Sequence, residues 1–189
     1  MNKVRTFQPA SQVFILTGKV QSGKSTLVEA VIQELRGAGL RVAGVVSRGI
    51  DREGKRQGYR LVNIESMETC PLASLDPVKD WFQFRRFFFN PAAIGLGRTW
   101  LEEGLLGSAD LLLIDEVGPM ELQGGGWAPF LEKLADRKNT PSQLWVVREQ
   151  ILTEVIEKWA LNNGKVMRME QVTCRSVVEN MLPKLLDHA

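Results

Sequence analysis

Short apolar runs alternate with stretches of helical periodicity along most of the chain. Five apolar runs predict buried strands, at residues 13–17, 41–47, 111–114, 143–147 and 165–169. Apolar residues recur at helical spacing between them, which predicts one helix that ends near residue 37 and others over residues 91–106, 127–137, 149–159 and 176–186. This alternation predicts an α/β fold with a mainly parallel sheet in three layers. Because no linker or repeat interrupts it, we expect a single domain over residues 1–189.

The middle of the chain departs from this alternation. Residues 48–64 are first polar and then apolar, which predicts a small antiparallel hairpin that turns at residues 51–54. We expect its basic residues to form a solvated face rather than to touch a nucleotide: Arg52, Lys55, Arg56 and Arg60. Residues 65–80 carry two prolines and are expected to be irregular, and residues 82–89 to form one aromatic strand. We expect the phenylalanines at 87–89 to be core rather than a stacking surface.

Composition narrows the class of protein. A net charge of +2 with 24% charged residues gives no reason to expect nucleic acid or an anionic membrane as the partner. The apolar runs are too short to span a membrane, and the polar residues 1–12 lack a signal-peptide segment, so we expect a cytoplasmic protein. Cys70 and Cys174 lack metal-type spacing and are expected to be reduced thiols. The only histidine is His188, which argues against histidine-based catalysis.

A glycine-rich loop carries the first chemical signature. Residues 18–26 fit the phosphate-binding pattern G-x-x-x-x-G-K-[ST] between a predicted strand and a predicted helix. Backbone N–H groups of such a loop converge on phosphate oxygens, and the helix N-terminus adds partial positive charge. Lys24 is expected to reach the β- and γ-phosphates, and the Ser25 hydroxyl to bind Mg²⁺. The residues expected to hold the nucleotide are Gly18, Lys19, Val20, Gln21, Ser22, Gly23, Lys24, Ser25 and Thr26.

An acidic pair ends the strand predicted at 111–114. Ligands bind at the carboxyl ends of parallel strands, so Asp115 is expected to act as the Walker B carboxylate that holds Mg²⁺ directly or through water. Glu116 is then placed to orient or deprotonate the attacking water. Residues 115–118 also fit the D-x-x-G pattern of GTP-binding switch proteins, but the chain has no [NT]-K-x-D motif. The sequence therefore does not support strong guanine specificity.

These motifs together resemble a known family. The chain is similar to the small nucleoside-triphosphatases first described in thermophiles, which include the cancer-related nucleoside triphosphatase. Four segments carry the resemblance: residues 18–26, 44–62, 114–122 and 172–173. The resemblance implies a RecA-like fold and slow, Mg²⁺-dependent hydrolysis of several nucleoside triphosphates, with the loop and acidic-pair roles falling on Lys24, Ser25, Asp115 and Glu116.

The chain also departs from that family's pattern. Arg48 and Gly49 stand where acidic residues are frequent, Pro119 stands where Lys is frequent, and an Asn-Arg pair after residue 173 is missing, with Arg175 the nearest base. The resemblance implies that the strand at 143–147 lies between the loop strand and the acidic-pair strand. Arg148 at its tip then faces the γ-phosphate and can stabilise charge there. Arg148 alternatively caps the sheet edge or pairs with Glu149 or Glu154.

Three functions therefore stay open for the chain. The first is hydrolysis of ATP, GTP or related triphosphates, with Mg²⁺ as cofactor. The second is a nucleotide or small-molecule kinase, for which Arg85 and Arg86 offer only a thin acceptor site. The third is a regulatory or adaptor module that uses hydrolysis as a timer. The pairing of Glu116 with the phosphate loop favours the first.

Overall fold

The structure is a computed structural model that describes residues 11–19, 22–135, 137 and 139–186. Val20 and Gln21 of the phosphate loop, His188 and residues 1–10 lie outside these ranges. The strands are β1 (Val13–Gly18), β2 (Val42–Arg52), β3 (Lys55–Asn63), β4 (Thr69–Ser74), β5 (Phe82–Phe84), β6 (Phe87–Phe89), β7 (Leu111–Val117), β8 (Ser142–Arg148) and β9 (Lys165–Arg168). The helices are α1 (Lys24–Gly37), α2 (Pro91–Leu106), α3 (Pro119–Leu122), α4 (Ala128–Ala135), α5 (Leu152–Lys158) and α6 (Cys174–Leu186), with 3₁₀ turns at Glu149–Ile151 and Met169–Gln171.

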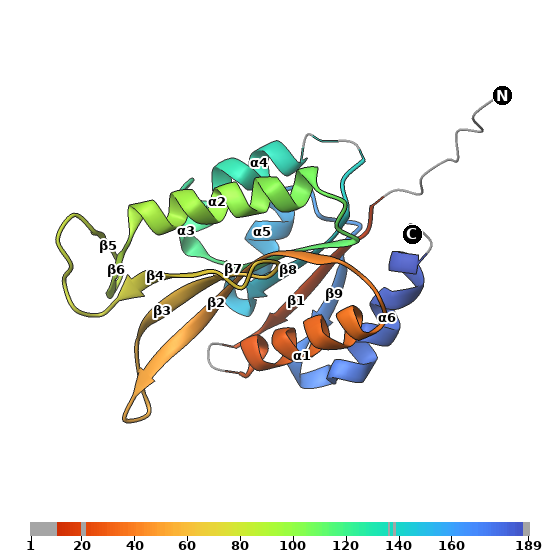
Figure 1. Ribbon diagram of the computed structural model, residues 1–189, viewed down its shortest axis with the longest axis horizontal. Coiled ribbons are helices and arrows are strands. Elements are labelled where there is room, and N and C mark those ends of the chain that lie inside the picture. The colour runs from red at the N-terminus through yellow and green to blue at the C-terminus, as the bar shows by residue number, and fades with distance from the viewer. Residues whose placement is uncertain (1–10, 20–21, 136, 138, 187–189) are drawn as a thin grey trace.

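All nine strands belong to one mixed sheet in the order β5-β6-β4-β3-β2-β7-β8-β1-β9. The pairs from β2 through β7, β8 and β1 to β9 are parallel, and those from β2 through β3, β4 and β6 to β5 are antiparallel. The predicted α/β class is confirmed, but the antiparallel part is much larger than the small hairpin that the sequence predicted. It forms the extended wing of the molecule in Figure 1.

Helices cover both faces of the parallel strands. Helices α1 and α6 lie on one face, and α2 and α4 on the other (Figure 1). Alternate residues of a strand point to opposite faces, so Leu111 and Leu113 of β7 pack with α1 and α6, whereas Leu112 and Ile114 pack with the helices on the other side. This explains the continuous apolar run in β7, because both faces of that strand are buried.

Two segments differ from the sequence prediction. Residues 69–74 form strand β4 instead of irregular chain, with Pro71 opposite Arg60 where the β3–β4 register shifts. A proline fits there because it has no N–H to donate to the ladder. The aromatic segment forms two three-residue strands, β5 and β6, rather than one strand, and the turn between them holds Arg85 and Arg86. Arg85 occupies the left-handed region, at φ 53°.

Strands β2 and β7 approach closely at Gly44, which pairs with Leu113. Gly44 has φ 117°, and a Cβ atom there would lie 2.0 Å from the carbonyl oxygen of Leu113. Only glycine therefore fits this position.

Two expectations from composition can be compared with the structure. Among the described residues, no helix is long and apolar enough to cross a membrane. Both cysteines, Cys70 and Cys174, are free thiols, as expected.

Candidate functional site

Three parallel strands end at the same edge of the sheet and carry the predicted site residues there. β1 leads into the phosphate loop and α1, β7 carries Asp115 and Glu116, and β8 ends at Arg148. β8 pairs with β1 on one side and with β7 on the other, which is the order that the family resemblance implied. Segments distant in the sequence thus meet at this edge (Figure 1).

The phosphate loop turns into α1 at Gly23. Its φ of 85° lies in the left-handed region that glycine adopts without strain. The Lys24 Nζ donates to the carbonyl oxygens of Gly18 and Lys19 at 2.9 and 2.6 Å, which holds the ammonium over the loop. Partial burial lowers the pKa of Lys24, while the charges of Glu116 and Asp115 oppose that shift. A cation is thereby fixed where the motif expects the phosphates.

Asp115 is only 2% exposed, and both of its carboxylate oxygens are anchored. Oδ1 accepts from the backbone N–H of Glu116, and Oδ2 from that of Ser47 on β2, each at 2.9 Å. Burial and the neighbouring charge of Glu116 raise the pKa of Asp115 to about 7. These contacts leave each carboxylate oxygen one lone pair for a further partner.

Glu116 lies in a bulge of β7 with unusual backbone geometry. The β7–β8 register shifts between Ile114 and Val117, and Glu116 has φ 59°. A non-glycine residue in this region costs about 1–3 kcal/mol, and such strain clusters at functional sites. The bulge leaves Glu116 half-buried at the edge, where Arg148 Nη2 approaches its Oε2 at 2.8 Å.

In the described part of the chain, Arg148 pairs with Glu116 and not with Glu149 or Glu154, which the sequence left open as partners. The Arg148 Nε lies 3.3 Å from the same Glu116 oxygen, so two of the three guanidinium nitrogens face one carboxylate oxygen. Within the described ranges, no ion pair joins Arg148 to Glu149 or Glu154, and Glu149 pairs with Arg168 instead. Arg148 therefore points toward the acidic pair of β7 rather than along the surface.

A cavity of about 410 Å³ is lined by part of the predicted site, whereas Asp115, Gly18 and Lys19 do not line it. Its walls include the described loop residues from Ser22 to Thr26, together with Glu116 and Arg148. Sequence reasoning missed the cavity's contribution from the antiparallel wing. That contribution comes from Asp51, Gly54, Arg56, Tyr59 and Arg86.

The expectation of a fully solvated basic face on the β2–β3 hairpin is correct for most of its residues but wrong for Arg56. Arg52, Lys55 and Arg60 are exposed. Arg56 instead pairs with Asp51 at 2.8 Å and lies 5.0 Å from the centre of the Tyr59 ring. A spacing of three residues along a strand does not predict this contact, because side chains alternate between the two faces. No sequence signal connects Arg56 or Tyr59 to the loop either.

The oxygen atoms near Asp115 suit a hard divalent cation. Mg²⁺ binds through one or two protein oxygens together with phosphate oxygens and water. Ser25 carries the loop hydroxyl, and the buried Ser47 hydroxyl beside Asp115 has no hydrogen-bond partner among the described residues. No cluster of three or more His, Cys, Asp or Glu suited to a metal occurs within those residues. These protein oxygens therefore fit a cation that takes its remaining ligands from phosphate oxygens and water.

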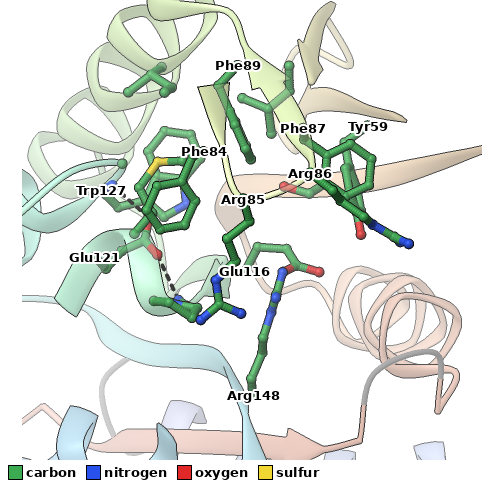
Figure 2. A pocket seen from close by; sticks show the side chains of 17 residues that line it. Tyr59, Phe84, Arg85, Arg86, Phe87, Phe89, Glu116, Glu121, Trp127 and Arg148 are labelled. Atoms are coloured by element: carbon green, nitrogen blue, oxygen red, sulfur yellow. Dashed lines mark hydrogen bonds and ion pairs between the residues drawn. The ribbon is translucent and has the colours of Figure 1, made fainter. Parts of the chain in front are cut away.

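A second, larger cavity of about 550 Å³ adjoins the first on the far side of Glu116. Figure 2 shows Phe84, Trp127 and Glu121 on one side of this cavity and Tyr59 with Arg86 on the other. Glu121 is 4% exposed and accepts from the backbone N–H groups of Gly118 and Trp127 at 2.7 and 3.2 Å. Burial raises the pKa of Glu121 to about 7, although those N–H donors favour its charged form.

Hydrogen bonds hold the glycine-rich connection at residues 124–126 in place. The Gly125 N–H donates to the Met120 carbonyl, and Arg98 Nε donates to the Gly126 carbonyl at 2.7 Å. The segment thus fixes Trp127, whose indole N–H donates to the Asp115 carbonyl at 3.0 Å. The connection therefore supports the acidic pair from behind.

The chain is similar in sequence and in fold to proteins named nucleoside-triphosphatases. The nucleoside-triphosphatase THEP1 of Caldivirga maquilingensis is 29% identical over 90% of this chain and 93% of its own length. That of Ignicoccus hospitalis is 35% identical over 57% of this chain, and the match spans 60% of the relative's length. The crystal structure of THEP1 from Aquifex aeolicus has a TM-score of 0.70 at 19% identity, with 92% and 99% of the two chains covered. The solution structure of a human cancer-related nucleoside triphosphatase has a TM-score of 0.66 at 21% identity, with 93% and 96% covered.

A family model extends the likeness over most of the chain. The model of the family described as NTPase matches residues 13–181, from the first residue of β1 into α6. This span contains the phosphate loop, the acidic pair and Arg148. The chain therefore belongs to the P-loop NTPase family that its sequence motifs predicted.

Proposed function

We propose that the protein hydrolyses the β–γ bond of nucleoside triphosphates with Mg²⁺. One observation carries the proposal: a single cavity is lined by the phosphate loop, by Glu116 and by Arg148. Membership in the NTPase family and the similarity to proteins named nucleoside-triphosphatase THEP1 support it. The order of β1, β8 and β7 supports a RecA-like fold for residues 1–189, acting as one domain.

The loop binds and orients the triphosphate. Backbone N–H groups at the N-terminus of α1 face the phosphates, and residues 18–26 enclose them. Lys24 exchanges its carbonyl contacts for oxygens of the β- and γ-phosphates. Its charge then stabilises the negative charge that develops as the γ-phosphoryl is transferred.

Ser25 and Asp115 hold the metal in this proposal. The Ser25 hydroxyl binds Mg²⁺ directly, and Asp115 acts directly or through water, because two backbone N–H groups already occupy part of its carboxylate. Bound Mg²⁺ neutralises charge on the β- and γ-phosphates. Asp115 then titrates at a lower pH than without the cation, because a positive charge favours the carboxylate.

Glu116 and Arg148 act at the γ-phosphate. The oxygen of a water molecule attacks phosphorus, a water proton passes to Glu116, and the bond to the bridging oxygen breaks so that the diphosphate leaves. Arg148 orients Glu116 through their ion pair and offers N–H donors to the transferring phosphoryl. The absence of an [NT]-K-x-D motif from the sequence supports broad base specificity.

A turnover panel tests the proposal. Phosphate release is measured with ATP, GTP, CTP and UTP, with and without Mg²⁺, for the wild type and Lys24→Ala. We expect Mg²⁺-dependent release from several triphosphates and a loss of at least about a hundredfold in Lys24→Ala, because the loop cation acts on the transferring group. Lys133→Ala is the matched control, because Lys133 on α4 is exposed and pairs with Glu102 on α2. A Lys24→Ala protein that stays active contradicts the assignment.

A further inference from the structure

The larger cavity has the position of a second substrate site. Four residues line both it and the phosphate-loop cavity: Tyr59, Arg86, Glu116 and Arg148. Its volume of about 550 Å³ falls within the range of small-molecule sites, roughly 300–1,000 Å³. These four residues therefore form the border between a molecule in this cavity and the cavity of the phosphate loop.

Aromatic rings form most of the apolar wall. They are Tyr59, Phe84, Phe87, Phe89 and Trp127. Several are fixed by edge contacts, with 5.3 Å between the ring centres of Tyr59 and Phe87 and 6.4 Å between those of Phe84 and Phe89. The expectation that the run 87–89 is core is only partly correct, because Phe87 is buried and Phe89 packs against the core, yet both also line the cavity. Walls of this kind hold a planar ring.

The charges of the cavity leave two guanidinium groups for a ligand. Arg148 is paired with Glu116, and the Glu121 carboxyl is occupied by two backbone N–H donors. No carboxylate within the described ranges pairs with Arg85 or Arg86, and both line the cavity. Guanidinium groups bind phosphate with two parallel hydrogen bonds. The unpaired charge therefore favours an anionic ligand with a phosphate group.

The β5–β6 turn aims these two arginines. Arg85 has φ 53°, which is unfavourable for a residue other than glycine, and its side chain points from the turn into the cavity between Glu121 and Arg148 (Figure 2). Arg86 lies 4.9 Å from the centre of the Phe87 ring and extends toward Tyr59. The turn thus places two exposed arginines at the cavity, Arg85 in its wall and Arg86 at its border with the phosphate-loop cavity.

The base of the triphosphate is not the expected occupant. In the proposed function, on which this inference rests, Glu116 acts at the γ-phosphate. The base is attached through the ribose at the opposite end of the triphosphate chain. A cavity on the far side of Glu116 from the loop therefore lies beyond the transferring phosphoryl group, where an acceptor must approach for in-line displacement.

We propose that this cavity binds a nucleoside monophosphate as phosphoryl acceptor. Its base packs among the aromatic rings, and Arg85 and Arg86 hold its phosphate. An oxygen of that phosphate attacks the γ-phosphorus, the bond to the β–γ bridging oxygen breaks, and two nucleoside diphosphates form. A phosphate monoester has its second pKa near about 6, so the attacking oxygen carries no proton at pH 8. The step therefore needs no proton acceptor, in contrast to attack by water.

Binding is tested first, without turnover. AMP, GMP, CMP and UMP are titrated into the wild-type protein by calorimetry, in the absence and in the presence of saturating ADP and Mg²⁺. We expect at least one of them to bind in both conditions, and Arg85→Ala to weaken that binding by about tenfold or more. Arg41→Ala is the control, because this exposed arginine precedes β2 at the opposite edge of the sheet. The proposal is wrong if none binds, or if ADP abolishes the binding.

Transfer is tested with triphosphate labelled on the γ-phosphate. We expect label in the added nucleotide as well as in free phosphate. Glu116→Gln should reduce the label in free phosphate far more than the label in the diphosphate, since only water must lose a proton. If labelled free phosphate forms but none of the added monophosphates becomes a labelled diphosphate, the acceptor site is refuted. The proposed function then still stands. If neither product forms, the proposed function fails, and the titration alone decides whether the cavity binds monophosphates.

Discussion

Glu116 and Arg148 restrain each other from neighbouring strands, and each is itself unusual. Glu116 holds left-handed backbone geometry in a bulge, and Arg148 directs two nitrogens at one of its oxygens. An arginine that only neutralised Glu116 could be exchanged for lysine at little cost. One that also donates to the transferring phosphoryl needs the planar guanidinium, because lysine cannot donate along two parallel directions.

Arg148→Ala is therefore expected to lower turnover by at least about tenfold, equivalent to roughly 1.4 kcal/mol of transition-state stabilisation. Affinity for the diphosphate should stay unchanged, because the diphosphate lacks the γ-phosphate. Steady-state turnover and a diphosphate titration measure the two quantities, with Arg148→Lys as the comparison that keeps the charge. Unchanged turnover in Arg148→Ala would exclude a role at the γ-phosphate.

Glu121 gives the fold a dependence on pH. Burial raises the pKa of Glu121 from 4.5 to about 7, so the folded chain keeps this proton over a range in which the unfolded chain loses it. The folded state binds more protons between these values, and its stability therefore falls as pH rises from about 4.5 to 7. One such group contributes up to about 1.4 kcal/mol per pH unit to that slope.

Urea unfolding measures the free energy of unfolding at pH 5, 6 and 7. This free energy should fall less steeply with rising pH in Glu121→Gln than in the wild type. The glutamine also lowers stability at every pH, because its NH₂ group cannot accept from a backbone N–H. That offset does not change the slope. Asp115→Asn serves for comparison, since burial also raises the pKa of Asp115 to about 7 and its removal leaves the contribution of Glu121 in place. Equal slopes in the wild type and Glu121→Gln would contradict this assignment.

At the scale of elements, the contact between β2 and β7 holds the acidic pair in position. Gly44 lets the two backbones approach, and three residues further along β2 the N–H of Ser47 reaches Asp115. A side chain at Gly44 would push the strands apart. It would therefore disturb both the core and the position of the Walker B carboxylate.

Gly44→Ala is expected to lower the free energy of unfolding by about 3 kcal/mol, from the left-handed backbone and the clash with Leu113 together. Gly37→Ala is the matched control, because an added Cβ there meets nothing within 4 Å at the end of α1. It should stabilise the protein by less than about 1 kcal/mol. Urea denaturation compares the two, and equal effects would show that the close approach does not matter.

Sequence periodicity predicted the elements that pack on both faces of the parallel strands, and the predicted hairpin at 48–64 is confirmed as the β2–β3 pair. Periodicity failed in the rest of the wing. Helix α2 has the predicted bounds of 91–106 because Pro91 follows the capping residue Asn90, whose side chain accepts from the Ala92 N–H. Strand β4 was missed because Pro71 argues against a strand unless the partner bulges, as β3 does here. The turn at Arg85 was missed because it lacks the glycine or asparagine typical of such turns.

At the scale of the whole molecule, the site residues also fall into those that the sequence predicts and those that it does not. The phosphate loop and the acidic pair could be predicted because each is a short local pattern tied to one strand end. Arg56, Tyr59, Arg86 and Glu121 could not, because the folding of the antiparallel wing and the α3–α4 connection brings them to the cavities. Their positions depend on registers between strands, which a single sequence does not encode locally.

The central position of β8 also bears on how the chain is made. Synthesis runs from β1 through β7 before β8 exists, yet β8 is the strand that joins those two. Until residue 148 has emerged from the ribosome, β1 and β7 each present an unpaired apolar edge, which is a template for association with other chains. Parallel pairing between such distant segments is slow. Nascent chains that stop short of β8 should therefore aggregate or bind chaperones. In the complete chain, β8 should pair with β1 and β7 in one late, cooperative step that covers both edges.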